Sequence, residues 1–401
     1  MIASHSHSAR RRLLLARSLR GAIDGLVSVL LAAYLARLGF STLQIGAIVT
    51  GTLLGSAALT MAAGLLSPRL SLRRVLLGAS GLMVLTGVGF AAGGSFWLLL
   101  AIAVVGTLNP SSGDVSVFLP VEQALLARVT GAAERAGWFA RYNLSGTGGA
   151  ALGALFAGVP AQLAAMTGVA VLAAERGVFL VYAGVGVAMW AIYRSLPQAS
   201  GEGGGGAPLA QSRSAVFRLA ALFSLDSFGG GFAVQSLLVL WLQQRFGLSL
   251  AVLGPVFFAS GLLSAASQLV SAKLVGGIGH VRTMVFTHLP ANGFLILAGM
   301  APTAEIAIGC LLARAAMSQM DVPARQAFVM SIVPAEERAA AASVTNVPRS
   351  LASAIAPLLA GLLLQHSTFG WPLICGGVIK SVYDLLLLAQ FRDHAMADES
   401  E

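Results

Sequence analysis

Four aspartates interrupt long apolar stretches of this chain. They are Asp24, Asp114, Asp226 and Asp321. If these stretches cross a bilayer, each acid is a functional candidate by default, because a charged side chain at the bilayer centre costs about 2.5–3.5 kcal/mol on insertion scales. A carboxyl group that moves between an unpaired position and one beside an arginine can load and release a proton. The acids therefore indicate proton coupling.

Two of these stretches carry a polar seam at helical spacing. The first has positions i, i+3, i+7 and i+11 occupied by Arg17, Arg20, Asp24 and Ser28. The second has positions i, i+4, i+7 and i+11 occupied by Arg314, Ser318, Asp321 and Arg325. Such spacing puts each set on one helix face. The acids either face a water-accessible path or pair structurally, Asp24 with Arg20 and Asp321 with Arg325 or Arg314.

Other charged residues inside apolar stretches allow similar alternatives. Asp114 lies among serines on a segment interrupted by Pro110 and Gly113. Arg349 either attracts an anion or pairs with Asp321. Lys380 and Asp384 stand at i and i+4, which predicts a structural ion pair.

The composition excludes several classes of protein. Apolar residues make up 57% of the 401 residues and charged residues only 10%, whereas a soluble domain has roughly 25% charged residues. With a mean hydropathy of +0.82, the chain must be solvated by lipid, which excludes a soluble enzyme and a disordered protein. The two cysteines, Cys310 and Cys375, lie in apolar stretches and exclude a disulfide scaffold.

Chemical motifs of other classes are missing from the sequence. It contains no Gly-rich phosphate loop, no metal-spaced His/Cys cluster and no nucleophile elbow. We therefore expect neither an enzyme nor a cofactor or metal site. The net charge of +9 is dispersed along the chain, so we expect no nucleic acid as partner.

The elements that must position these residues are membrane-spanning helices, which need about 20 apolar residues each. The sequence predicts twelve, over residues 20–37, 43–66, 75–93, 96–121, 137–158, 174–193, 217–243, 251–272, 283–301, 304–331, 339–364 and 371–391. In this layout, eighteen Lys and Arg residues lie on the side of the membrane that holds the N-terminus, three lie on the opposite side and four lie within spans. This bias predicts cytoplasmic N- and C-termini in an inner membrane.

A polar, Gly-rich segment divides the chain. It includes GEGGGG and is typical of a flexible linker. We predict a six-helix half over 1–196, a cytoplasmic linker over 197–216 and a second six-helix half over 217–401.

The two halves repeat each other. Pro120–Asn143 aligns without a gap on Pro323–Asn346 at an offset of 203 residues. The matches include two pairs at predicted helix starts, Glu134-Arg135 and Glu337-Arg338, where a negative charge suits the helix N-terminus. We expect these pairs to have a structural or gating role. Parallel repeats of this kind are typical of transporters whose halves rock around a central site.

Over essentially its whole length, the chain resembles the major facilitator superfamily. The loop after the second span, GLLSPRLSLRRV, is similar to the superfamily motif between helices 2 and 3. The matching positions include Gly64, Arg69, Arg73 and Arg74, whereas the motif's acid is Pro68 and its second glycine is Ser71.

A second motif resembles that of drug or metabolite:proton antiporters. The segment GAALGALFAG in the fifth span contributes Gly149, Gly153 and Gly158, with Ala154 where the motif has proline. The equivalent proline of the second half is Pro357. Glycines at these positions let helices approach closely.

The resemblance implies an all-α fold of two pseudo-symmetric bundles, with spans 1, 4, 7 and 10 lining a central cavity. The four aspartates lie in those spans, as does Arg314. We therefore expect a monomeric, multi-pass secondary transporter that exports a small solute in exchange for protons by alternating access. The alternatives are proton-coupled uptake of a metabolite and a non-transporting sensor or assembly protein.

Overall fold

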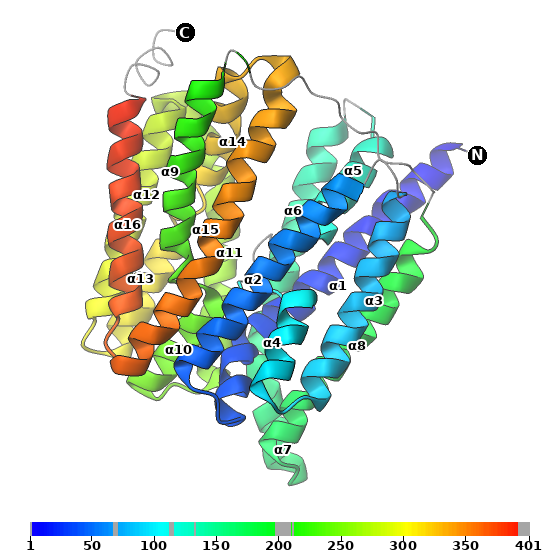
Figure 1. Ribbon diagram of the computed structural model, residues 1–401, viewed down its shortest axis with the longest axis vertical. Helices are drawn as coiled ribbons and strands as arrows, with labels where there is room; N and C mark the ends of the chain where they lie inside the picture. The colour runs from blue at the N-terminus through cyan, green and yellow to red at the C-terminus, as the bar shows by residue number, and fades with distance from the viewer. Residues whose placement is uncertain are drawn as a thin grey trace. The chain divides into compact units, whose positions relative to one another are not determined.

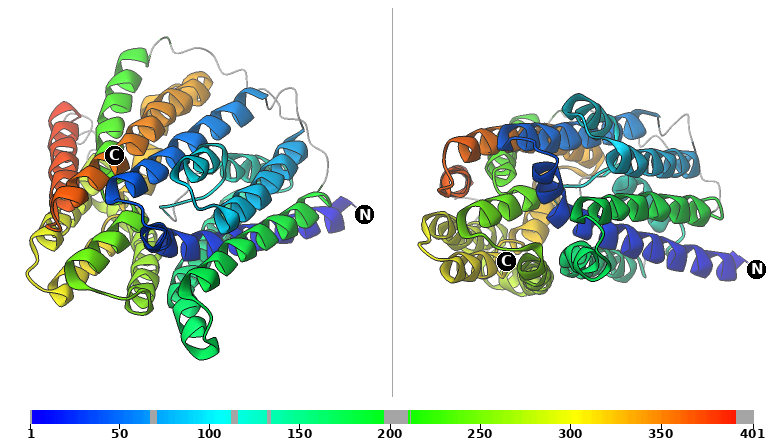
Figure 2. Two further views of the ribbon diagram at one scale, coloured as in Figure 1. Left: turned by 60° about the horizontal axis from the view of Figure 1, so that its bottom comes forward. Right: turned by 90° about the horizontal axis from the view of Figure 1, so that it is seen from below.

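The computed structural model describes residues 2–66, 71–111, 116–131, 134–196, 210 and 212–391, and its regular elements are helices (Figure 1). In chain order they are α1 (Ile2–Arg37), α2 (Thr42–Leu66), α3 (Leu72–Ala92), α4 (Phe96–Val105), α5 (Phe118–Arg128), α6 (Arg135–Leu155), η2 (Phe156–Gly158), α7 (Val159–Thr167), α8 (Val171–Tyr193), α9 (Arg213–Gly231), α10 (Gln235–Phe246), α11 (Leu250–Ile278), α12 (His280–Met300), α13 (Ala304–Ala315), α14 (Asp321–Ile332), η3 (Ala335–Glu337), α15 (Arg338–His366) and α16 (Trp371–Gln390). Figure 2 shows the same helices from two further directions.

Ten helical stretches in the described part of the chain are long and apolar enough to cross a membrane. They confirm an all-helical, multi-pass membrane protein. The count of twelve spans and the cytoplasmic placement of both termini stay predictions.

Two predicted spans are each divided into two helices, and only for the first did the sequence predict an interruption, at Pro110 and Gly113. The span at 96–121 consists of α4 and α5, with a break that contains Pro110. The span at 304–331 consists of α13 and α14, and α14 has Pro323 in its first turn. Proline has no amide hydrogen and its ring clashes with the preceding turn, so it suits a helix start and disfavours a helix interior.

The first compact unit comprises Met1–Gly203 and Leu248–Phe258. In it α1 packs along α6, and α3 packs along α8. A Cβ atom at Gly25 would overlap the carbonyl oxygen of Ala150, and one at Gly153 would overlap that of Ala22. The glycines therefore allow the two backbones to touch.

The second compact unit comprises Gly204–Gly247 and Ala259–Glu401. In it α9 packs along α15, and α12 along α16. A buried apolar cluster holds the ends of α9, α12, α14, α15 and α16 together, and it includes Phe223, Val285, Phe328 and Leu387. Again one glycine sets the closest approach, because a Cβ at Gly231 would overlap the carbonyl oxygen of Ser353.

The internal repeat reappears in this packing. Ser353 follows Ala150 by 203 residues, the offset found in the sequence, and the glycines that face them, Gly231 and Gly25, are 206 residues apart. A second pair of contacts shows the same two offsets. A Cβ at Gly21 would lie 2.5 Å from the carbonyl oxygen of Gly146, and Ser227 is hydrogen-bonded to Arg349. Residues of α1 therefore correspond to residues of α9 at an offset of 206.

Candidate functional site

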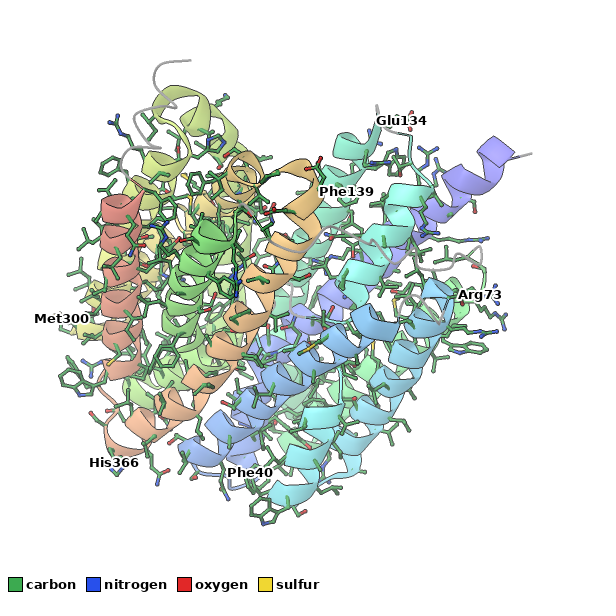
Figure 3. All side chains as sticks on the ribbon, turned by 45° about the horizontal axis from the view of Figure 1, so that its top comes forward. Phe40, Arg73, Glu134, Phe139, Met300 and His366 are labelled. Atoms are coloured by element: carbon green, nitrogen blue, oxygen red, sulfur yellow. The ribbon has the colours of Figure 1, made fainter. Side chains whose placement is uncertain are left out.

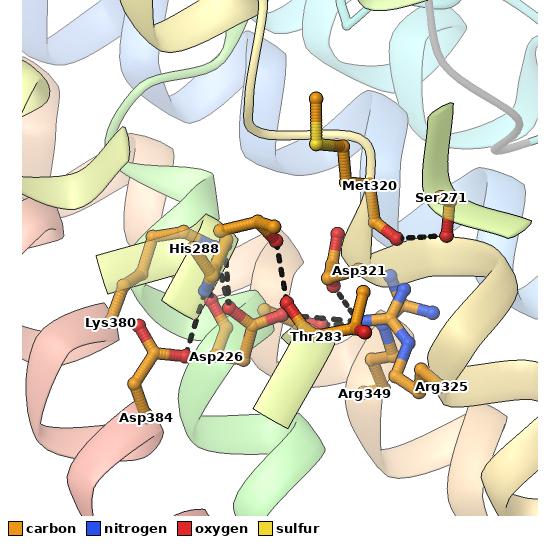
Figure 4. Close-up of polar contacts among 12 residues, drawn as sticks. Asp226, Ser271, Thr283, His288, Met320, Asp321, Arg325, Arg349, Lys380 and Asp384 are labelled. Carbon is orange, nitrogen blue, oxygen red and sulfur yellow. Dashed lines mark hydrogen bonds and ion pairs between the residues drawn. The ribbon is translucent and has the colours of Figure 1, made fainter. Parts of the chain in front are cut away.

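Asp226 on α9 is the centre of a buried charge cluster in the second unit (Figure 4). Its Oδ1 lies 2.5 Å from Nζ of Lys380 on α16. Its Oδ2 lies 3.3 Å from Nη1 of Arg325 on α14. Nε2 of His288 on α12 is 3.8 Å from Oδ1. Asp226 is only 4% exposed, so this carboxylate is paired with cations in the interior and links three neighbouring helices to α9.

Asp321 and Arg349 extend this cluster. Oδ2 of Asp321 lies 3.3 Å from Nη1 of Arg325, one turn further along α14. Of the two alternatives considered for Asp321, the structure contains the ion pair, with Arg325 as the partner. Arg349 on α15 donates from Nε to the hydroxyl of Ser227, 2.7 Å away. Arg349 thus has a neutral hydrogen-bond partner on α9.

The predicted ion pair between Lys380 and Asp384 is wrong. Lys380 reaches across to Asp226, whereas Asp384 turns to α12 and contacts His288, with 2.9 Å between Oδ1 and Nδ1. Its Oδ2 accepts a hydrogen bond of 2.8 Å from the amide of Asn292. Spacing of i and i+4 puts two side chains within reach of each other, but both face the interior and each meets a partner on a different helix.

His288 and Asn292 were missed by the sequence analysis. Both are buried, at 3% and 1% exposure. The available signal was their own spacing of i and i+4 within a predicted span, which puts two polar side chains on one face of an apolar helix. A polar face inside a membrane helix indicates polar partners on its neighbours.

The first unit contains a second buried cluster, between α1, α5, α6 and α8. Arg20 pairs with Glu122 and also donates to the hydroxyl of Ser116 at 2.7 Å. Glu122 accepts further hydrogen bonds from the hydroxyls of Tyr142 and Tyr193. Arg20 is 1% exposed and Glu122 is completely buried. Glu122 was missed as a site residue, although it lies in the repeated segment.

Asp24 is different from the other described aspartates. It is 6% exposed, and its Oδ1 is buried without a hydrogen-bond partner. The ion pair with Arg20, one of the two alternatives for Asp24, is not formed, since Arg20 bonds to Glu122 and Ser116. Asp24 is therefore a buried acid whose neighbouring base is already engaged.

Two glycines of the antiporter-like motif pack against the part of α1 that carries Asp24. A Cβ at Gly149 would lie 2.5 Å from the carbonyl oxygen of Ser18, and Gly153 contacts Ala22. Gly158 lies against Ala251, in the part of α11 that belongs to the same unit. The motif thus sets the distance between α6 and the part of α1 that carries Asp24. Its counterpart Pro357 lies inside α15.

Two of the predicted motif-loop residues make hydrogen bonds near helix ends. Arg73 donates to the carbonyl oxygen of Leu196 at 3.3 Å, and the amide of Arg74 donates to Ser71, the N-cap of α3. Gly64 lies near the end of α2. Arg69 and Asp114 lie outside the described residues, as does most of the predicted linker.

The two repeated Glu-Arg pairs mark equivalent helix starts, as expected. Arg135 begins α6 and Arg338 begins α15, with a glutamate at each N-cap. Glu134 pairs with Arg10 at 2.6 Å and is visible at the edge of the first unit (Figure 3). Glu337 accepts hydrogen bonds from the backbone amides of Ala210 and Ser212, at 3.0 and 3.1 Å.

Arg314 is the remaining predicted site residue. It lies near the end of α13, and its Nε is buried without a hydrogen-bond partner. The structure therefore joins Asp226, Asp321 and Arg349 in one cluster through Arg325 and Ser227, while Asp24 belongs to the other unit.

Comparisons with known proteins agree with this architecture. Residues 13–320 match a family model described as the Major Facilitator Superfamily. The uncharacterized membrane protein YJR124C of Saccharomyces cerevisiae is 26% identical over 404 residues, which cover 92% of this chain and 90% of that protein. The multidrug efflux protein YfmO of Bacillus subtilis is 32% identical over 138 residues, 34% of this chain and 35% of YfmO.

Solved structures share the fold at low sequence identity. The crystal structure of a mutant form of the nucleoside transporter NupG superposes with a TM-score of 0.76 at 12% identity. The match covers 96% of this chain and 100% of NupG. At this identity the likeness shows the fold alone.

Proposed function

The chain belongs to the major facilitator superfamily, and we propose that it is a proton-coupled exporter of a small solute. The family and the fold identify a membrane transporter rather than an enzyme. The proposal adds the coupling ion, the direction of transport and the residue that carries the proton. It also places the protein in the cytoplasmic membrane, as a monomer that works by alternating access.

The observation that carries the proposal is the partnerless oxygen of Asp24. An ionised carboxylate without a compensating partner is very costly in a protein interior. Such a group holds a proton or is paired with a cation that arrives from outside. Because Arg20 is engaged by Glu122 and Ser116, Asp24 can change its protonation without breaking an existing ion pair. These are the properties required of a coupling residue.

The other described aspartates are less suited to this role. Asp226 faces Lys380, Arg325 and His288, and Asp321 faces Arg325. Removing one partner from a buried ion pair costs about 3–5 kcal/mol. Protonation of either acid in each transport cycle would therefore greatly lower the stability of the protein. We assign them to the cohesion of the second unit. Asp114 stays a candidate coupling residue because of its place in the sequence.

The direction of transport is proposed from two supporting features. Gly149 and Gly153 of the antiporter-like motif pack α6 on the part of α1 that carries Asp24. The relative YfmO, similar over about a third of this chain, is a multidrug efflux protein. In an exporter the substrate leaves while the acid takes up a proton, and the proton is released on the opposite side. A substrate and a proton that compete for one site are coupled, because each occupies the site in a different conformational state.

The test is transport by the purified chain in proteoliposomes with an imposed pH gradient, with ethidium and uridine as probes. We expect gradient-driven movement of at least one probe against the proton flow, and its loss in Asp24→Asn. The matched control is Glu336→Gln, because it makes the same acid-to-amide change at an exposed position.

Each other outcome contradicts a stated part of the proposal. Wild-type rates in Asp24→Asn would remove Asp24 from the coupling mechanism. Movement of a probe together with the protons would favour uptake over export. Gradient-independent flux by the wild type would exclude proton coupling, and no flux of either probe would count against export of these two classes of solute.

A further inference from the structure

His288 lies deep in the second unit between two carboxylates on different helices. Its Nδ1 is 2.9 Å from Oδ1 of Asp384 on α16, and its Nε2 is 3.8 Å from Oδ1 of Asp226 on α9. His288 and Asp384 are 3% and 0% exposed. Figure 4 shows the imidazole between these two side chains. The proposed transport function uses neither His288 nor Asp384.

The two carboxylates have very different surroundings. Asp226 is already paired with Lys380 and Arg325. Asp384 receives one hydrogen bond from the neutral amide of Asn292, at 2.8 Å, and its other oxygen faces His288. A completely buried, ionised carboxylate with only neutral donors would be costly. Asp384 therefore requires a proton, either on itself or on the imidazole.

The two nitrogens of the ring lead to the same conclusion. A neutral imidazole has one N–H and one lone pair, whereas an imidazolium has two N–H groups. Here both ring nitrogens face carboxylate oxygens. A neutral ring protonated on Nδ1 would donate to Asp384 but turn the lone pair of Nε2 towards Asp226, 3.8 Å away, and the other tautomer would turn the lone pair of Nδ1 towards Asp384. The arrangement is favourable when one additional proton lies between Nδ1 and Asp384 and Nε2–H faces Asp226.

We propose that His288 and Asp384 form a buried proton-binding site that ties α12 to α16. The bound proton comes from water and lies between Nδ1 of His288 and Oδ1 of Asp384. On release it returns to water, leaving a neutral imidazole and a carboxylate. The neutral ring then carries no positive charge and has a single N–H, so release weakens either its hydrogen bond with Asp384 on α16 or its charge contact with Asp226 on α9.

The charged and titratable groups around the ring come from each neighbouring helix. From α9 it faces Asp226, whose Oδ1 also contacts Lys380 of α16, and from α16 it faces Asp384 and the ring of Tyr383, whose centroid is 6.1 Å away. Arg325 on α14 is paired with Asp226, and Arg314 lies near the end of α13. Asp226 already has cationic partners, whereas Asp384 is only partly paired. The proton therefore lies on the side of the ring that faces α16.

The proposal can be tested by spectroscopy on the purified, full-length protein labelled with ¹⁵N-histidine. The ring signals of His288 are those that His288→Gln removes. Between about pH 5 and 8, we expect one of two results. In the first, both ring nitrogens carry protons. In the second, Nδ1 carries no proton and accepts a hydrogen bond, and the wild type shows an infrared band of a protonated carboxyl group that is absent in Asp384→Asn.

An unprotonated ring nitrogen together with an ionised Asp384 throughout this pH range would overturn the proposal. The wild-type spectra decide this even if a variant fails to fold. His366→Gln is the matched control, because His366 lies exposed at the end of α15 (Figure 3) and should leave the His288 signals unchanged. Asp24→Asn should also leave them unchanged, so loss of transport in that variant and absence of this proton site are separate outcomes.

Discussion

Glu122 and Arg325 occupy equivalent positions of the internal repeat and carry opposite charges, since they are 203 residues apart. Glu122 pairs with Arg20 on α1, and Arg325 pairs with Asp226 on α9. Arg20 and Asp226 are themselves equivalent, at the offset of 206 that the glycine contacts define. Each unit therefore has the same buried link between its first helix and the segment after its helix break, with the polarity of the pair reversed.

Removal of the acid from the first of these pairs should strongly destabilise the protein. Glu122→Gln leaves Arg20 buried without its carboxylate, and we expect a loss of about 3–5 kcal/mol in the free energy of unfolding. The measurement is chemical unfolding in detergent. Glu134→Gln is the control, because Glu134 is 63% exposed in its pair with Arg10 and such pairs contribute about 0–1 kcal/mol. Equal losses in both variants would contradict the buried pair.

The partner of Lys380 can be identified by double-mutant cycles. We expect a coupling free energy of about 0.5–3 kcal/mol between Lys380→Met and Asp226→Asn, because the two side chains are in contact. The cycle of Lys380→Met with Asp384→Asn should give a smaller value, since Asp384 bonds to His288 and Asn292. A larger coupling free energy of Lys380 with Asp384 than with Asp226 would instead support the ion pair that the sequence predicts.

The glycine contact between α1 and α6 should tolerate no side chain. Gly153→Ala puts a methyl group on the carbonyl oxygen of Ala22, and we expect a destabilisation of about 1–3 kcal/mol from overpacking. Gly148→Ala is the matched control on the same helix, because its new methyl group would meet no heavy atom within 4 Å. That control should be neutral or stabilising by up to about 1 kcal/mol, since alanine favours helix more than glycine. A melting curve of each variant checks both expectations.

The carboxylate of Glu337 should stabilise the start of α9. It accepts hydrogen bonds from the amides of Ala210 and Ser212 and from the hydroxyl of Ser212. Glu337→Ala leaves these donors without their acceptor, and we expect a cost of about 1–3 kcal/mol. Glu336→Ala, at the exposed neighbouring position, should change the melting temperature little. A similar loss in both variants would exclude a specific capping role.

The sequence by itself determined the fold class and the family. Its apolar stretches are long enough for spanning helices, and the repeat from Pro120 to Asn143 identified equivalent positions in the two halves. Helix formation and hydrophobic periodicity depend on residues close together in the chain, so they can be read without a structure. The break in α4–α5 was partly visible in Pro110, which we noted without placing the end of a helix there.

The tertiary structure decided which charges meet. Spacing along α16 predicted a bond between Lys380 and Asp384, but their partners are Asp226 and His288 on two other helices. Arg20 likewise turns from Asp24 to Glu122, about a hundred residues away. Partner choice depends on how closely neighbouring helices approach, which contacts such as Gly25 with Ala150 set. Those distances join residues far apart in the chain, and no local pattern specifies them.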